Sequence, residues 1–214
     1  MTNPVLILGA GKLGRLALDI FSGNEVLVYG FLDENKKLHN TEISEVLVLG
    51  DINDESYLGI IGNKTEAFVA IEHRAAKEKT VKQLLEQKKT MPVNAVHIKA
   101  VVSEDAEVGH GILIAAGAVV NPIAKIGNHS VIHSGAVIDT AAVIGEYAEI
   151  GAGAVINSEA EIGKGAFIGS GAVVVSGIKI GKNARVGAGS VVIEDVKDGQ
   201  TVFGNPAAAV GKES

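Results

Sequence analysis

Cysteine is absent from the 214 residues, and no stretch of the chain is strongly basic or apolar over a long run. The lack of cysteine excludes disulfides, thiolate zinc sites and a cysteine nucleophile. A formal net charge of −6 without a basic run argues against a nucleic-acid partner, which would need clustered Lys and Arg. No segment approaches the roughly 18 consecutive apolar residues of a membrane span, so we expect no membrane partner. Any chemistry must come from oxygen or nitrogen atoms.

The first residues, Met1 to Pro4, lead directly into a short apolar segment. They lack the basic region, the long apolar stretch and the small-residue cleavage site of a secretory signal, so we expect a cytoplasmic protein. Charge is dense before about residue 100, and Gly, Ala, Val and Ile dominate afterwards. This change of composition predicts two domains, at residues 1–95 and 96–214.

A repeat of six residues fills the second half of the chain. From Val102 to Val192, every sixth residue is Val or Ile, at sixteen consecutive positions. Four residues after each comes a second series of Ala or Ser, from which Ile112, Ile178 and Val196 depart. A period of six fits neither a 3.6-residue helix nor an alternating hairpin, and it predicts an all-β parallel β-helix with three hexads per triangular coil. One aliphatic side chain per hexad offsets only part of the lost backbone entropy, so we also expect contacts between subunits.

The N-terminal half has the pattern of an α/β Rossmann-like half-domain. Val5 to Leu8 has the character of a buried strand, Gly9 to Gly14 that of a glycine turn, and Glu25 to Leu32 that of a second strand, which ends at Asp33. This spacing is typical of a dinucleotide site, where glycines let the backbone approach a pyrophosphate and an acid binds a ribose. About ninety residues provide room for little more than one mononucleotide-binding half.

Three interpretations of the glycine turn stay open. A nucleotide-sugar diphosphate is favoured over NAD, because a full NAD site uses two such halves. The third interpretation is that the turn serves strand–helix packing alone. Further strands are expected at residues 46–49 and 67–71. An amphipathic helix is expected after them, from Arg74 to Lys89, with inward-facing residues Ala75, Val81, Leu84 and Leu85.

This combination of domains resembles the bacterial nucleotide-amino-sugar N-acetyltransferases and sialic-acid O-acetyltransferase-like proteins, which are hexapeptide-repeat acyltransferases. The resemblance covers nearly the whole chain, and the matching stretches are Gly9–Gly11 through Asp19, Gly30–Glu34, Val48–Asp51, Val96–His97, Ser134–Asp139, Val143–Glu146 and Gly204–Ala207. It implies a left-handed β-helix and a homotrimer. It also implies acetyl-CoA-dependent acyl transfer to the amino or hydroxyl group of a nucleotide-linked sugar in surface-glycan biosynthesis.

The chain departs from this family at the catalytic positions. In the family a histidine general base and an orienting acid follow the Ser-Gly-Ala-Val-Ile-Asp stretch. This chain has Thr140 and Ala141 there, directly after Asp139. A second hypothesis therefore stays open, in which the chain is a catalytically impaired, trimeric nucleotide-sugar-binding or assembly module. Whether the chain is an enzyme depends on a replacement for the missing base.

His133 is the candidate replacement. It stands where the family usually has an asparagine that lines the sugar site. Within one chain His133 and Thr140 belong to different corners of the triangle, so our hypothesis is that His133 of one subunit lies opposite Thr140 of its neighbour. The alternative is a solvated histidine on an outward face.

The resemblance also points to residues that bind the two substrates. For the nucleotide sugar these are the backbone at Gly11, Lys12 and Leu13 and the acids Asp33 and Glu34; the family has Gly-His where this chain has Lys12-Leu13. For acetyl-CoA they are Glu149, where the family has a histidine beside the acetyl group, and the amides of Ser170 and Ala188.

The remaining charged residues have weaker assignments. Lys179, Lys182 and Arg185 are candidates to meet the phosphates of the cofactor, and ordinary solvation is the equal alternative. His110 and His129 are expected one coil apart at one corner of the prism, and no metal is expected because no third ligand clusters with them. His39 and His73 are expected in N-terminal loops without partners.

Overall fold

The computed structural model describes residues 3–210, and the chain divides between Ile98 and Lys99 into two compact units. Met1 and Thr2, which begin the segment considered for a secretory signal, lie outside the described residues. Within the described part of the chain, no helix combines the length and the apolar character that crossing a bilayer requires.

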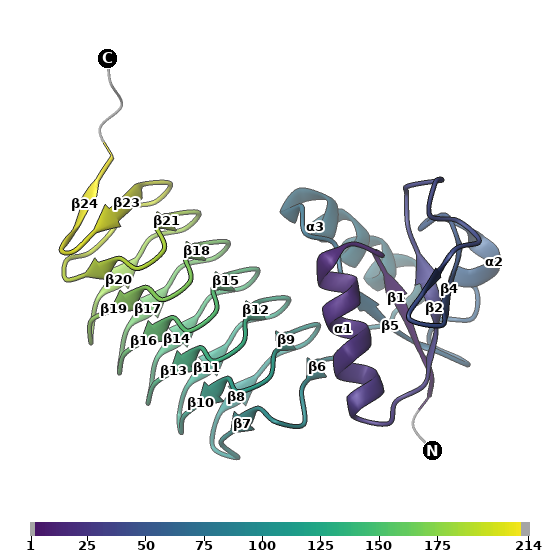
Figure 1. Cartoon of the computed structure of the whole chain (residues 1–214), viewed down its shortest axis with the longest axis horizontal. Helices are drawn as coiled ribbons and strands as arrows, with labels where there is room; N and C mark the ends of the chain where they lie inside the picture. Colours follow the sequence, from purple (N-terminus) through teal and green to yellow (C-terminus); the bar gives the residue numbers. More distant parts are fainter. Residues whose placement is uncertain (1–2, 211–214) are drawn as a thin grey trace. The chain divides into compact units, whose positions relative to one another are not determined.

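The first unit is an α/β domain built on one five-stranded sheet in the order β3-β4-β2-β1-β5 (Figure 1). Neighbouring strands run parallel except β3, which is antiparallel to β4. The strands are β1 (Val5–Leu8), β2 (Val28–Leu32), β3 (Glu42–Ile43), β4 (Val46–Gly50) and β5 (Glu66–Val69). The other elements are α1 (Lys12–Gly23), α2 (Glu55–Leu58), α3 (Arg74–Gln83), the π-helical turn η1 (Leu84–Lys88) and β6 (Ala95–Val96).

Both sides of this sheet are covered, which explains why β1 is a continuous apolar run with all four residues buried. On one side, Leu8 packs in a cluster with Leu58 of α2 and Val81 of α3. On the other side, Phe21 of α1 meets Phe68 of β5 edge-on, with ring centroids 5.8 Å apart. The sheet therefore holds the glycine turn between β1 and α1 on a rigid base.

The helix expected from Arg74 to Lys89 is present but consists of two pieces, α3 and η1. Val81 and Leu84 are buried as expected. Ala75, in the first turn of α3, is exposed, and Leu85 is 37% exposed. A π-turn adds a residue to the helical repeat, so side chains after Leu84 lose the phase that the α-helical pattern predicts.

The second unit is a parallel β-helix of stacked triangular coils, coloured from teal to yellow in Figure 1. Two-residue strands recur every six residues, and each pairs with the strand one coil later; Val119, for example, lies beside Val137. In each strand the second residue points inward. From Ile114 onward all of these Val and Ile residues are buried. Val102 and Val108 of the first coil are partly exposed.

Three sheets form the sides of this prism. The valine sheet contains β7 (Val101–Val102), β10 (Val119–Val120), β13 (Val137–Ile138), β16 (Val155–Ile156), β19 (Val173–Val174) and β22 (Val191–Val192). The ladder sheet contains β8 (Glu107–Val108), β11 (Lys125–Ile126), β14 (Val143–Ile144), β17 (Glu161–Ile162) and β20 (Lys179–Ile180). The histidine sheet contains β9 (Leu113–Ile114), β12 (Val131–Ile132), β15 (Glu149–Ile150), β18 (Phe167–Ile168), β21 (Arg185–Val186) and the hairpin of β23 (Thr201–Gly204) and β24 (Ala207–Ala209).

Candidate functional site

The three glycines of the N-terminal turn differ in what a Cβ atom at each position would contact. A Cβ on Gly14 would lie 2.0 Å from the carbonyl oxygen of Gly9, and one on Gly9 would lie 2.6 Å from that of Ala70. Both residues are therefore required by backbone packing alone. A Cβ on Gly11 would meet only the side chain of Glu72, at 3.3 Å. Gly11 is thus the glycine whose missing side chain leaves the backbone open to a ligand.

The N-terminus of α1, where a phosphate was expected, holds a carboxylate of the chain itself. Oε1 of Glu72 accepts hydrogen bonds from the backbone N–H groups of Lys12, at 3.0 Å, and Leu13, at 3.4 Å. Helix N-termini stabilise negative charge through these unsatisfied donors. Glu72 is exposed, so a diphosphate that used the same amides would have to displace its side chain into water. The sequence offers no local signal for this contact, because Glu72 is 60 residues from Lys12.

Asp33 and Glu34 differ in the number of hydrogen bonds that their side chains make within the chain. Oδ2 of Asp33 accepts from the backbone N–H of Ala10 at 2.7 Å, and Oδ1 accepts from that of Asn35 at 2.8 Å. His39 is not without a partner, as its Nε2 lies 2.7 Å from the carbonyl oxygen of Asp33. Glu34 is exposed and makes no hydrogen bond or ion pair among residues 3–210. Asp33 therefore holds the turn together, whereas the exposed carboxylate of Glu34 is available to a ligand.

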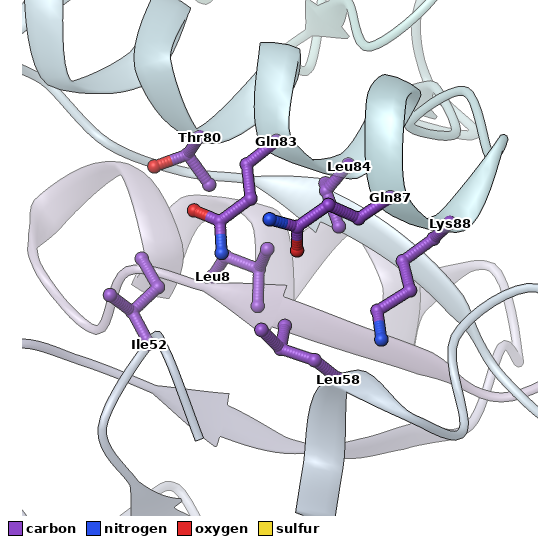
Figure 2. A pocket seen from close by; sticks show the side chains of 8 residues that line it. All are labelled: Leu8, Ile52, Leu58, Thr80, Gln83, Leu84, Gln87 and Lys88. Carbon is purple, nitrogen blue, oxygen red and sulfur yellow. The ribbon is translucent and has the colours of Figure 1, made fainter. Parts of the chain in front are cut away.

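A small hollow on the sheet side covered by α3 is not large enough to be the nucleotide site. Figure 2 shows Thr80, Gln83 and Gln87 from the helical segment above an apolar floor that includes Leu8 and Ile52. Its interior volume is about 10 Å³, the space of about one water molecule. The nucleotide-sugar candidates therefore stay with the glycine turn.

On the prism, the histidine sheet brings together two residues with different expected roles. Nε2 of His133 lies 2.9 Å from Oε1 of Glu149. The register explains this contact, because β12 pairs with β15 so that Val131 lies beside Glu149, and the backbone N–H of His133 donates to the carbonyl of Ile150. The two side chains are 28% and 46% exposed. They form an imidazole–carboxylate pair at the surface of one chain.

Thr140 and Asp139 lie at another corner of the prism. Both carboxylate oxygens of Asp139 accept hydrogen bonds from neighbouring residues. Its Oδ1 accepts from the backbone N–H of Thr140 at 2.8 Å and from Nδ2 of Asn121 at 2.9 Å, and its Oδ2 accepts from Oγ of Ser158 at 2.9 Å. These hydrogen bonds, with that from Thr140 the strongest, lower the pKa of Asp139 below its ordinary value of 3.8. Asp139 therefore remains ionised, and its carboxylate cross-links three successive coils. Within one chain neither residue has a hydrogen bond to His133.

The corner that joins the histidine sheet to the valine sheet has the features proposed for the acetyl-CoA contacts. Its outermost residues, one per coil, are Ser134, Ala152, Ser170 and Ala188, and all four are exposed. Their backbone N–H groups donate no hydrogen bond within the described part of the chain. The corner therefore presents a row of small side chains and available amide donors, and His133 directly precedes its first member.

The three cations proposed for the cofactor phosphates have unequal surroundings. Nζ of Lys179 forms an ion pair with Glu161 at 3.0 Å, and the hydrogen bond from that glutamate raises the pKa of Lys179 above 10.5. The guanidinium of Arg185 lies 4.6 Å from the centre of the Phe167 ring. Lys182 is exposed and has no ion pair among residues 3–210. Lys179 is therefore the weakest of the three candidates.

His110 and His129 do occupy one corner, where the backbone N–H of His129 donates to the carbonyl of His110. His129 is 5% exposed, and its ring lies 4.9 Å from that of Tyr147. Across residues 3–210, no group of three or more His, Cys, Asp or Glu side chains is arranged to hold a metal ion.

Two protein families match the chain. The family described as bacterial transferase hexapeptide (six repeats) matches residues 123–158 and 159–194, and the PglD N-terminal domain matches residues 4–84. These matches bear out the resemblance to the hexapeptide-repeat acyltransferases of the bacterial nucleotide-amino-sugar N-acetyltransferase type. The second unit of the chain is therefore a left-handed parallel β-helix, as the resemblance implied. No curated protein sequence matches it significantly.

Solved structures resemble the chain over nearly its whole length. Perosamine N-acetyltransferase from Caulobacter crescentus, a histidine-to-asparagine variant in complex with CoA and GDP-perosamine, has 28% identity, a TM-score of 0.89 and 99% coverage of both chains. WeeI from Acinetobacter baumannii AYE has 25% identity and a TM-score of 0.79, over 97% of this chain and 99% of that one. The acetyltransferase domain of PglB from Neisseria gonorrhoeae FA1090, in complex with acetyl coenzyme A, shares the fold, with 21% identity, a TM-score of 0.88 and coverage of 98% and 100%.

Proposed function

We propose that this protein transfers the acetyl group of acetyl-CoA to the amino or hydroxyl group of a nucleotide-linked sugar, in the cytoplasm and on a path to surface glycans. The observation that carries the proposal is the full-length similarity to an acetyltransferase solved with CoA and a GDP-linked amino sugar. Both parts of that similarity have a counterpart here: an open glycine turn at Gly11 and a corner of available amides along the prism.

The nucleotide sugar is proposed to bind at the glycine turn of the first unit. Its diphosphate would replace the Glu72 carboxylate on the amides of Lys12 and Leu13, and Glu34 would bind the ribose. Acetyl-CoA is proposed to lie along the corner that contains Ser170 and Ala188, with Arg185 and Lys182 near its phosphates. We propose His133 as the general base.

A homotrimer completes this proposal, with the valine sheet as the surface that a second copy covers. The outward residue of this sheet is valine in all six coils, and the six side chains lie in register. The ladder sheet instead presents charges, such as the Glu107–Lys125 pair at 2.9 Å. Val101 is exposed and the other five are partly exposed, and a continuous aliphatic surface of this kind favours an interaction site. His133 and Thr140 flank the valine sheet at opposite edges, which favours their meeting across a subunit contact.

Release of the CoA thiol tests the activity. The protein would be mixed with acetyl-CoA and a panel of GDP-, UDP- and dTDP-linked amino sugars, and thiol release would be followed beside thermal stability with each ligand alone. We expect turnover with at least one amino sugar and none with the same nucleotide lacking the sugar. Stabilisation by a nucleotide sugar without thiol release for any acceptor would contradict the transferase.

That second outcome belongs to the other hypothesis, a trimeric binding or assembly module without catalysis. The specific observation in its favour is the pair Thr140 and Ala141 at the positions of the family's base and its acid. It predicts ligand binding at the glycine turn, and no difference in thiol release between the wild-type protein and His133→Ala.

A further inference from the structure

The strongest unassigned feature of the molecule is the contact between His133 and Glu149. Its two residues are 16 positions apart, and they come from adjacent coils of the histidine sheet. The resemblance implies that Glu149 contacts acetyl-CoA. In the structure its carboxylate lies within hydrogen-bond distance of an imidazole nitrogen, at 2.9 Å.

The surroundings make this pair specific. On the outer side of the sheet, Glu149 lies between Val131 of the preceding strand and Phe167 of the next, and neither can pair with a carboxylate. The next charged residue of the sheet is Arg185, which lies over the ring of Phe167. The outward carboxylates of the ladder sheet pair with lysines, whereas Glu149 pairs with a histidine.

The position of His133 within its own series also singles it out. After the other strands from β9 to β21, the residues that take the same place are Ala115, Gly151, Gly169 and Gly187. None of them carries a side chain that could donate a hydrogen bond along this edge. His133 is therefore the one side chain of this series that can reach the carboxylate of the neighbouring coil.

The hydrogen bond fixes the tautomer of the ring. An ionised carboxylate only accepts hydrogen bonds, so the nitrogen that faces it carries the hydrogen. Nε2 of the neutral ring is then the donor to Glu149, and Nδ1 keeps its lone pair. Nδ1 makes no hydrogen bond within residues 3–210, and His133 directly precedes Ser134, the first residue of the corner with the available amides.

We infer that Glu149 is a positioning residue that holds Nε2–H of His133, so that Nδ1 is the atom that takes the proton of the acceptor. The inference rests on the proposed function. The acceptor nitrogen or oxygen forms a bond to the thioester carbonyl carbon, and Nδ1 takes its proton. The carbon–sulfur bond then breaks, and the same proton passes to the sulfur of the departing CoA.

Steady-state kinetics of four variants test this role. His133→Ala should lower kcat by about 10² to 10⁴, the usual contribution of a positioned base. Glu149→Ala should lower kcat by about tenfold or more with the KM for acetyl-CoA unchanged, and Glu149→Gln should recover part of the loss because its carbonyl still accepts from Nε2–H. The double variant should be no slower than His133→Ala, because Glu149 acts through the ring.

Glu161→Gln is the matched control. Glu161 occupies the same place in its hexad, before an inward isoleucine, and its ion pair is with Lys179. Its loss should leave kcat unchanged. A raised KM for acetyl-CoA with unchanged kcat in Glu149→Ala would indicate that Glu149 binds the cofactor, and it would overturn the inference.

Nitrogen-15 NMR of labelled histidine separates this inference from the proposed function. The resonances of His133, identified by their loss in His133→Ala, should show a protonated Nε2 and an unprotonated Nδ1 near neutral pH. Glu149→Ala should give a mixture of tautomers. If the wild-type protein transfers no acetyl group, the proposed function fails, and the ring spectrum still decides whether Glu149 positions His133. A wild-type ring protonated at Nδ1 would overturn the inference even in an active enzyme.

Discussion

Some residues that the family resemblance assigns to catalysis have a structural role in this protein. Asp139 follows the Ser-Gly-Ala-Val-Ile stretch that resembles a catalytic motif, and its carboxylate accepts hydrogen bonds from Asn121, Thr140 and Ser158. These donors belong to three coils. The residue therefore stabilises the stack at the corner where the family has its base, whatever the chain catalyses.

Asp139→Asn should destabilise the protein in a pH-dependent manner. The folded-state pKa of Asp139 is lowered, so its stabilising effect is present above 3.8 and is lost as the pH falls through the folded-state pKa. We expect a loss of about 1 kcal/mol in unfolding free energy at neutral pH, because a part-exposed charged acceptor is replaced by a neutral one. Urea unfolding at neutral pH and again well below pH 3.8 measures it. A loss of equal size at both pH values would contradict this account.

Glu72 gives a second prediction at the residue scale. Glu72→Gln should destabilise the first unit by about 0.5 kcal/mol, since an exposed carboxylate near a helix N-terminus contributes little more than this. The same change should tighten binding of a nucleoside diphosphate, because the competing charge is gone. Calorimetric titration with GDP and UDP measures the affinity, with Glu78→Gln, a partly exposed glutamate of α3 that pairs with Arg74, as the control. Weaker nucleotide binding in Glu72→Gln would show that the carboxylate does not compete.

At the scale of the elements, the corners of the prism differ in backbone strain. The corner between the histidine and valine sheets has glycine at each left-handed position, such as Gly135 with φ 69°. The corner between the valine and ladder sheets has Ile123, Ala141 and Glu159 in that conformation, with φ of 65°, 59° and 62°. A β-branched residue is unfavourable there. Ile123 is also 59% exposed, so little burial offsets its strain.

Ile123→Asn should therefore stabilise the prism by about 0.5 to 1 kcal/mol, because asparagine tolerates the left-handed region without the entropic cost of glycine. Thermal unfolding of the variant should show a higher midpoint. Lys125→Asn is the control two residues later, in the extended strand β11, where asparagine is disfavoured. It should lower the midpoint, and a decrease in both variants would contradict the strain argument.

These elements also show what a sequence can reveal. The buried column and the triangular coils follow from spacing alone, because only a repeat of six aligns Val and Ile on one inner line. Counting one coil forward from Val131 leads to Glu149, so the register contains the neighbourhood of His133; alignment with the family assigned Glu149 elsewhere. The contact of Glu72 with Lys12 had no such signal, because it depends on how β5 and α1 lie across the sheet. The π-turn at Leu84 was likewise hidden under an α-helical pattern.

At the scale of the whole molecule, the sides of the prism differ in whether they suit contact with solvent or with another subunit. The ladder sheet pairs Glu107 with Lys125 and Glu161 with Lys179, so its charges are satisfied by neighbours in the same sheet. The valine sheet has no charged residue among its outward positions. Water solvates the charged ladder sheet well and the aliphatic valine sheet poorly. This difference supports a second copy of the chain on the valine sheet.

Val155→Glu should prevent this assembly, because a carboxylate at the centre of a buried aliphatic contact would be left unpaired. Sedimentation velocity should show a trimer for the wild-type protein and a single chain for the variant. Circular dichroism should show the prism still folded, since Val155 points outward. Val143→Glu is the matched control, an outward valine of the ladder sheet between Lys125 and Glu161. It should remain trimeric. If His133 works opposite Thr140 of a neighbour, Val155→Glu should also lose acetyl transfer while the Val143 variant keeps it; a folded, fully active single chain would place the whole reaction within one prism.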